Sequence, residues 1–199
     1  MDVRKKAVIK ISLENYIEFV DDYFLNLLGY SLTDFITKPP KTVCHPDMPS
    51  IIHQTIGGYI MNRQEGFAVL KHATRSGDYI WAFTYYAPYY NAKGELEAFI
   101  TYRKPIPDRK LNNRAEPLKE SVTHLYAKLK DIENHFGDEV ARKYLIGYLE
   151  NRGLKSLEED YYHFFDFDKK ELRKYFEINE KTPHRIIRKY LSHNGLNVF

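Results

Sequence analysis

Three consecutive segments with the composition of β-strands constrain the fold of this chain more than any other feature. They cover residues 66–74 (GFAVLKHAT), 78–90 (DYIWAFTYYAPYY) and 95–104 (ELEAFITYRK), and short glycine-containing turn signals separate them. This arrangement predicts an antiparallel three-strand meander. Side chains of the middle strand must alternate between the two faces of the sheet. One face is predicted to carry Tyr79, Trp81, Phe83 and Tyr85, and the other Ile80, Ala82, Thr84 and Tyr86.

A strand pair and several helices precede the meander. The strands are predicted at residues 7–12 (AVIKIS) and 16–20 (YIEFV). Helices are expected at residues 21–30, 31–35 and 49–62, of which the first has an acidic start and a glycine near its end. In the third, Gly57 and Gly58 have two interpretations: they leave space for a ligand, or the helix breaks there into a turn.

Bulk composition limits the classes of protein that fit. The 199 residues are 43% hydrophobic and carry 30 basic against 27 acidic side chains, so the charge is too balanced for a general nucleic-acid or membrane binder. No apolar run approaches the roughly 20 residues of a bilayer span, and a signal-peptide core is absent. We therefore expect a soluble, cytoplasmic protein. The single cysteine, Cys44, excludes an internal disulfide and a cysteine-rich metal site.

The composition changes near residue 105, where glycine becomes sparse and helical periodicity begins. We predict an α+β fold class with a sensor-like domain at residues 1–105, a proline-containing linker at 106–117 and an all-α region at 118–199. In residues 118–199, successive apolar residues are spaced alternately four and three positions apart, as in the seam of a heptad repeat. The seam comprises Leu118, Val122, Leu125, Leu129, Ile132 and Phe136. It favours either a dimeric signalling coiled coil or packing against the chain's own domain.

Four motifs resemble one known family. They are FVDDYFLNLLGYSLTDFI, HPDMP at residues 45–49, SGDYIW at 76–81 and FITYRKP at 99–105. Together they resemble a PAS sensor domain, and within that superfamily the bacterial aerotaxis-receptor type, over residues 8–105. The resemblance implies a five-stranded antiparallel sheet with short helices over one face, enclosing a small-molecule pocket. It also implies a signalling protein rather than an enzyme, with FAD as the cofactor of the aerotaxis-type members.

Residue by residue, the resemblance implies an altered flavin site. His45 and Asp47 match positions associated with flavin binding, whereas Cys44 replaces an expected arginine. Gly57 and Gly66 replace tryptophans, and Asp21 and His72 replace asparagines. The cofactor-site candidates are Asp21, Cys44, His45, Asp47, His53, Gly57, His72 and Trp81. The fold is expected to persist, while the pocket is expected to hold FAD, another small ligand or none.

Two residues near the HPDMP motif allow other chemistry. His53 lies on the helix from which haem-binding PAS domains take their axial histidine, so haem is one alternative. Cys44 is interpreted as a small residue before the helix, because neighbouring side chains in an extended segment, here Cys44 and His45, point apart. A reactive or redox-sensing thiol remains the alternative.

The C-terminal segment, residues 168–195, has the helix, turn, helix outline of a DNA-binding motif. Residues 168–199 hold eight Lys/Arg against four Asp/Glu, and Arg185, Arg188 and Lys189 could meet phosphates. A simple helical bundle explains the same pattern. The leading hypothesis is a homodimeric PAS protein that relays redox state or a small ligand to a protein partner, as in energy taxis. The alternatives are a DNA-binding regulator and a haem sensor.

Overall fold

The structure is a computed structural model that describes residues 5–106, 122–166 and 168–177. The chain divides into two compact units, residues 1–167 and residues 168–199. The helices that follow the sheet therefore lie in the same unit as the sheet, whereas the sequence-based division places a boundary at residues 105–118. As domain boundaries, the sequence-based limits stay a prediction.

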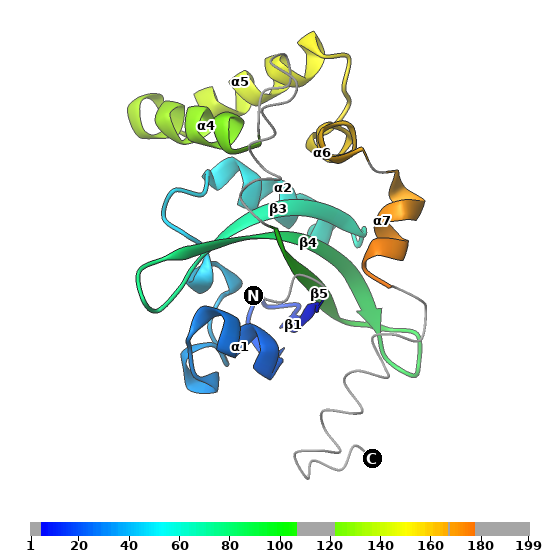
Figure 1. Ribbon diagram of the computed structural model, residues 1–199. Coiled ribbons are helices and arrows are strands. Elements are labelled where there is room, and N and C mark those ends of the chain that lie inside the picture. The colour runs from blue at the N-terminus through cyan, green and yellow to red at the C-terminus, as the bar shows by residue number, and fades with distance from the viewer. Residues whose placement is uncertain (1–4, 107–121, 167, 178–199) are drawn as a thin grey trace. The chain divides into compact units, whose positions relative to one another are not determined.

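A five-stranded antiparallel sheet forms the centre of the first unit (Figure 1). Its strands run in the order β2-β1-β5-β4-β3. Their bounds are β1 Ala7–Ser12, β2 Ile17–Val20, β3 Gly66–Ala73, β4 Tyr79–Tyr90 and β5 Leu96–Ile106. The predicted strand pair and meander are thus confirmed, and β1 joins them by pairing with β5.

Short helices connect β2 to β3. They are α1 (Asp22–Leu28), the 3-10 helices η1 (Leu32–Asp34) and η2 (Pro40–Val43), and α2 (Ser50–Met61). The chain leaves α1 through Gly29, whose φ of 75° belongs to the left-handed region that favours glycine. Helix α2 is continuous through Gly57 and Gly58. The interpretation that these glycines break the helix into a turn is therefore wrong.

The two faces of β4 have different covers, as the alternation predicts. Thr84 and Tyr86 line a cavity on the inner face, together with residues of α2. The outer face is covered by α4 (Val122–Phe136) and α6 (Leu157–Phe165), and α5 (Asp138–Asn151) packs on α4 (Figure 1). Aromatic side chains make the outer contact: ring centroids lie 5.8 Å apart for Trp81 and Tyr126, and 4.5 Å apart for Phe83 and Phe165.

The heptad seam of α4 packs within its own chain. Val122, Leu125, Leu129 and Ile132 are buried, whereas Phe136 is 70% exposed and Leu118 lies outside the described residues. Of the two interpretations of this periodicity, the structure shows packing on the chain's own domain. A coiled coil through the same residues would require α4 to leave the sheet. The homodimer remains a prediction.

The second unit contributes one described helix, α7 (Lys169–Tyr175). Asp168 and Glu171 form a capping box at its start. The three basic residues of the DNA-binding alternative, Arg185, Arg188 and Lys189, lie outside the described residues.

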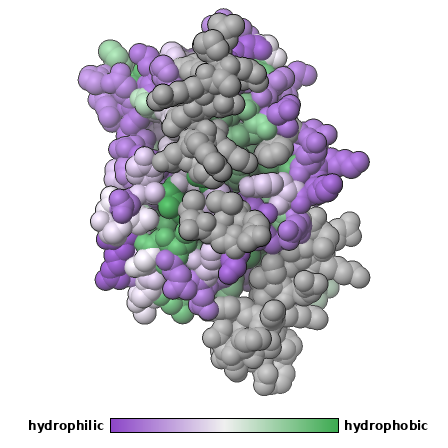
Figure 2. All heavy atoms as spheres, in the orientation of Figure 1, coloured by the Kyte–Doolittle hydropathy of each residue, from purple (hydrophilic) through white to green (hydrophobic). Residues whose placement is uncertain are grey.

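Polar and apolar residues are interspersed on the face of the molecule that Figure 2 shows, with one apolar area to the left of its centre. Within residues 5–106, 122–166 and 168–177, every helix is too short or too polar to cross a lipid bilayer.

Truncation of the α4 seam distinguishes packing within one chain from a coiled coil. We expect Leu129→Ala to lower the free energy of unfolding by about 2–5 kcal/mol, because Leu129 is fully buried and its removal leaves a cavity. The exposed Phe136 provides the control: Phe136→Ala should change the free energy of unfolding by no more than about 0.5 kcal/mol. Urea unfolding at two protein concentrations measures both. A loss that disappears at the lower concentration would instead indicate a dimeric seam.

Candidate functional site

An inner cavity of about 380 Å³ lies between the concave face of the sheet and α2. Most of its wall is apolar, with side chains from β1, the turn that follows β1, α2 and β3. This apolar part comprises Ile11, Leu13, Ile56, Ile60, Met61 and Leu70. A cavity of this volume and composition falls in the range of small-molecule sites.

Four polar side chains form the sheet wall of the cavity, and we call them the inner polar set: Thr84, Tyr86, Thr101 and Arg103. In the register of β4 and β5, Thr84 lies opposite Arg103 and Tyr86 lies opposite Thr101. Directly opposed side chains on one face are about 5 Å apart at Cβ, so the four groups form a compact square. All four are buried, and polar atoms of each lack a hydrogen-bond partner in the described structure.

Arg103 is the cation of this set and is only 3% exposed. Its Nε and Nη1 atoms have no hydrogen-bond partner among the described residues, and the guanidinium lies 5.0 Å from the ring centroid of Phe24. Burial lowers the pKa of Arg103 to about 10, which still leaves it charged at neutral pH. The nearby Cys44 does not neutralise it, because burial raises the pKa of that thiol to about 11.

Arg103 and its neighbours were missed as candidates at the sequence level. An arginine two residues before Pro105 at the end of a strand has the pattern of an exposed strand end. The alternation of side chains along the strands was the available signal. It places Thr101 and Arg103 on one face of β5, and Thr84 and Tyr86 on one face of β4.

Gly66 and Tyr86 are opposed across β3 and β4, and the ring of Tyr86 occupies the space that a side chain at position 66 would need. A Cβ atom at Gly66 would overlap the ring of Tyr86. The tryptophan that the family resemblance implies at position 66 is therefore sterically replaced by the ring of Tyr86, which reaches the cavity from the next strand.

Three of the sequence-predicted residues do line the inner cavity: Cys44, His53 and Gly57. The Cys44 thiol lies 3.9 Å from the carbonyl oxygen of Pro40. Burial lowers the pKa of His53, so its imidazole is neutral at pH 7. A Cβ atom built at Gly57 would meet no atom within 4 Å, so this position leaves open space at the helical wall.

Asp21 and His72 do not line this cavity. Asp21 caps α1 by accepting a hydrogen bond from the Phe24 amide at 2.9 Å, and it also accepts one from the Val8 amide at 2.7 Å. Burial raises the pKa of this carboxyl to about 6. His72 is fully buried, with Nδ1 3.3 Å from the Val43 carbonyl oxygen and its ring against Phe24.

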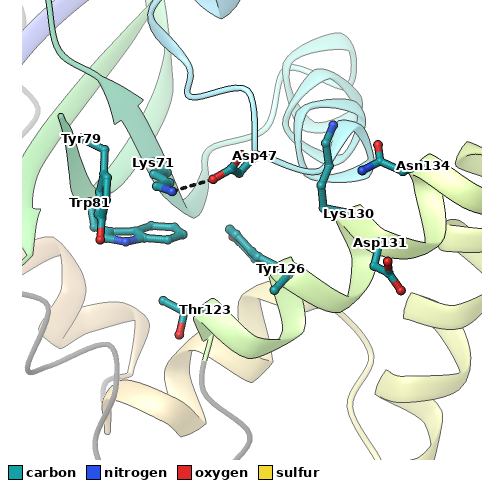
Figure 3. A pocket seen from close by; sticks show the side chains of 10 residues that line it. Asp47, Lys71, Tyr79, Trp81, Thr123, Tyr126, Lys130, Asp131 and Asn134 are labelled. Atoms are coloured by element: carbon teal, nitrogen blue, oxygen red, sulfur yellow. Dashed lines mark hydrogen bonds and ion pairs between the residues drawn. The ribbon is translucent and has the colours of Figure 1, made fainter. Parts of the chain in front are cut away.

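Asp47 and Trp81 belong to a second space, the outer groove, between the outer face of the sheet and α4 (Figure 3). It has a volume of about 440 Å³, and Lys71, Tyr126 and Lys130 also line it. The Asp47 carboxylate pairs with Lys71 Nζ at 2.9 Å, and this bond holds the pKa of Asp47 below its usual range. Trp81 therefore faces α4 and not the inner cavity, where a flavin would be expected.

His45 lies at the surface near this groove, apart from the inner cavity. Its Nδ1 accepts a hydrogen bond from the Asp47 amide at 3.2 Å, and its ring lies edge-on to Tyr79 with centroids 5.8 Å apart. Desolvation lowers the pKa of this imidazole, and the Lys71 charge adds to the effect. His45 and Cys44 thus point to different places, as expected for neighbours in an extended segment.

The first turn of α2, directly after the HPDMP motif, is bonded to α4. The Glu133 carboxylate of α4 accepts hydrogen bonds from the Ser50 amide at 2.9 Å, the Ser50 hydroxyl at 3.0 Å and the Ile51 amide at 3.0 Å. These donors are at the first turn of α2, where a carboxylate is favoured by both the free amides and the helix dipole. A further bond joins Gln54 of α2 to Asp138 of α5 at 2.9 Å.

Comparison with known families agrees with the sheet topology, since residues 17–103 match the PAS fold family. This part of the chain is a PAS domain, as the resemblance implied. Over 110 residues the chain is 24% identical to the aerotaxis receptor of Escherichia coli strain K12. That match covers 55% of this chain and 21% of the receptor, so the chain spans about a fifth of the receptor's length.

Solved structures similar to this chain include light-oxygen-voltage and PAS domains. A light-oxygen-voltage domain studied with a flavin analogue is 16% identical, with a TM-score of 0.49, over 65% of this chain and 88% of the other. A PAS domain of a protein from Colwellia psychrerythraea is 17% identical, with a TM-score of 0.47, over 52% and 88%. The fold assignment rests on the family match and the observed topology.

The residues at the positions that the resemblance assigns to FAD do not fit it. Gly57 offers no ring for an isoalloxazine, the ring of Tyr86 fills the space over Gly66, and the neutral Cys44 thiol cannot pair with a pyrophosphate. Among the described residues there is no cluster of three His, Cys, Asp or Glu side chains that could hold a metal ion. Haem bound through His53 alone remains a prediction.

The two glycines of α2 provide a matched pair, because only Gly57 lines the cavity. Both have open space where a Cβ would lie, and both are in a helix interior. We expect Gly57→Ala and Gly58→Ala each to raise the free energy of unfolding by about 0.5–1 kcal/mol, since alanine is the better helix former. Thermal or urea unfolding measures this. Stabilisation at Gly58 with destabilisation at Gly57 would show that the cavity wall tolerates no side chain.

The single cysteine gives a direct test of its own reactivity. With its pKa at about 11, the native Cys44 should be alkylated slowly by iodoacetamide at pH 7.5, and the rate should rise about tenfold per pH unit up to pH 10. The same chain in guanidinium chloride is the control and should react as an ordinary thiol. Fast alkylation of the folded protein at pH 7.5 would restore the reactive-thiol alternative.

Proposed function

We propose that the protein is a PAS sensor that takes a small molecule into its inner cavity and transmits the occupancy of that cavity to a protein partner through its C-terminal helices. The observation that carries this proposal is the position of α2. Its inner side supplies His53, Gly57 and Ile60 to the cavity, while its first turn is held by Glu133 of α4.

This arrangement provides a short physical route from ligand to surface. A ligand that displaces α2 by a fraction of a hydrogen-bond length must strain or break the three bonds to Glu133, since bonds of this kind weaken steeply with distance and angle. Helix α4 also contacts the outer face of the sheet through Tyr126, whose hydroxyl donates to the Val69 carbonyl oxygen at 2.8 Å. Both walls of the cavity are therefore connected to one helix.

The partner is proposed to be a protein in a signalling pathway, as in energy taxis. The similarity to the aerotaxis receptor supports a signalling role for the PAS domain. Signalling by redox state through FAD is not included, because Gly57, Gly66 and Cys44 do not supply the rings and the arginine that the resemblance implies for FAD. DNA binding through Arg185, Arg188 and Lys189 remains a prediction of the sequence.

Ligand occupancy is tested on freshly purified protein. A visible absorption spectrum distinguishes flavin and haem from colourless protein, and mass spectrometry after denaturation identifies a released molecule. A thermal-shift screen of a metabolite library then detects ligands lost in purification. We expect at least one compound to raise Tm, with the gain abolished in Gly57→Leu, which extends a side chain into the cavity. No released molecule and no stabilising compound would refute the sensor.

The connection to α4 is tested by a conservative change of its capping carboxylate. Glu133→Gln replaces one acceptor oxygen by a donor, so we expect the free energy of unfolding to fall by about 1 kcal/mol and the first-turn amides of α2 to exchange faster. A stabilising compound from the screen should then slow hydrogen exchange in α4 less than it does in the unaltered protein. The exposed Glu139→Gln on α5 is the matched control. Equal ligand effects on α4 in both variants would contradict the proposed route.

A further inference from the structure

We infer that the ligand of the inner cavity is a small organic carboxylate, whose carboxylate pairs with Arg103 and whose apolar body lies against α2. This inference rests on the proposed sensor function and specifies the chemical class of its ligand. It follows from the inner polar set, because a neutral molecule could accept its hydrogen bonds but could not neutralise the charge of Arg103.

The first step is the uncompensated charge of Arg103. A buried cation without a partner costs several kcal/mol, so a fold keeps one where something compensates it. Among the described residues no carboxylate forms an ion pair with Arg103, and Cys44 is a neutral thiol at physiological pH. No described residue therefore supplies the anion, and the carboxylate of a ligand in the cavity would do so.

The second step is the geometry of the free donors. The buried Nε and Nη1 atoms of Arg103 have no partner among the described residues. Nη1 lies on the Cδ side of the guanidinium and the Nε hydrogen on the other side, so the two groups point in different directions, and each can donate a charge-assisted hydrogen bond to a carboxylate oxygen. Two threonine hydroxyls lie beside the guanidinium. Thr84 is directly opposite Arg103 on β4, and Thr101 is two residues before it on the same face of β5. They have no partner of their own and can donate to the same oxygens.

The third step is the charge that the cavity can neutralise. Arg103 is the buried cation that lines the cavity. His53 also lines it, but its imidazole is neutral at pH 7. Lys41 also lines the cavity but is an exposed residue. One buried guanidinium matches a monoanion such as a carboxylate and leaves a phosphate dianion with an excess charge.

The remaining wall determines the body of the ligand. Apolar side chains of β1 and β3 flank the inner polar set, those of α2 also line the cavity, and Gly57 leaves open space at the helical wall. A ligand with a short alkyl chain or a single ring would bury apolar surface there, whereas a highly hydroxylated acid would lose its hydration without compensation.

The test compares acids with their neutral amides on the full chain. The probes are hexanoate and hexanamide, phenylacetate and phenylacetamide, with phenyl phosphate as the dianion, each titrated calorimetrically at constant ionic strength. We expect at least one acid to bind at least tenfold more tightly than its amide and more tightly than phenyl phosphate.

Substitution of Arg103 tests whether this residue sets the preference. Arg103→Met keeps the length of the side chain, removes the unpaired buried charge and should raise Tm of the free protein while abolishing the preference for acid over amide. Arg103→Lys retains a charge and should keep the preference with weaker binding. Arg75→Met removes an arginine that is 64% exposed at its side chain and pairs with Asp34, so it should bind acids as the unaltered protein does.

The outcomes separate the two proposals. Amides that bind as tightly as acids, or an acid preference that survives in Arg103→Met, would overturn the carboxylate inference and leave the sensor in place. Tighter binding of phenyl phosphate would replace the carboxylate by a phosphate ester. Binding of neither probe series overturns the inference, and the sensor fails with it only if the metabolite screen also finds no ligand.

Discussion

The rest of this structure depends on the burial of β4 on both of its faces. One face presents Trp81 and Phe83, large aromatic side chains that are costly to expose, and α4 and α6 cover them. The other face presents Thr84 and Tyr86 to a cavity beneath α2. Because successive side chains of a strand alternate, any ligand-driven shift of the cavity wall also moves the surface on which α4 packs.

The HPDMP motif is the place where these two layers meet. Asp47 pairs with Lys71 on β3, while the next turn of chain begins α2 and is capped by Glu133. The motif therefore contributes little to the inner cavity itself, where only the preceding Cys44 is found. Asp47 of the motif is bonded to β3, and Ser50 and Ile51, directly after the motif, are bonded to α4. In the proposed sensor this segment connects β3, α2 and α4 and does not contact the ligand.

Local patterns predicted the strands, their order along the chain and the two faces of β4. They placed Arg103 on the same face as Thr101 but did not predict its burial, because that burial depends on β1, β4 and Phe24 of α1, all distant in sequence. The bond between Glu133 and Ser50 joins residues 83 positions apart and leaves no local pattern. The seam of α4 shows a different limit: the same apolar spacing serves a partner helix or the chain's own sheet, so periodicity alone cannot choose.

The shared space of Gly66 and Tyr86 has a consequence for related chains. One ring fits between β3 and β4 at this level of the cavity, and either strand can supply it. Related sequences should therefore carry a large residue at one of these two positions and a small one at the other. Such paired exchange would change which strand presents an aromatic surface to the ligand while it preserves the volume of the cavity, so ligand class could diverge within the family without any loss of packing.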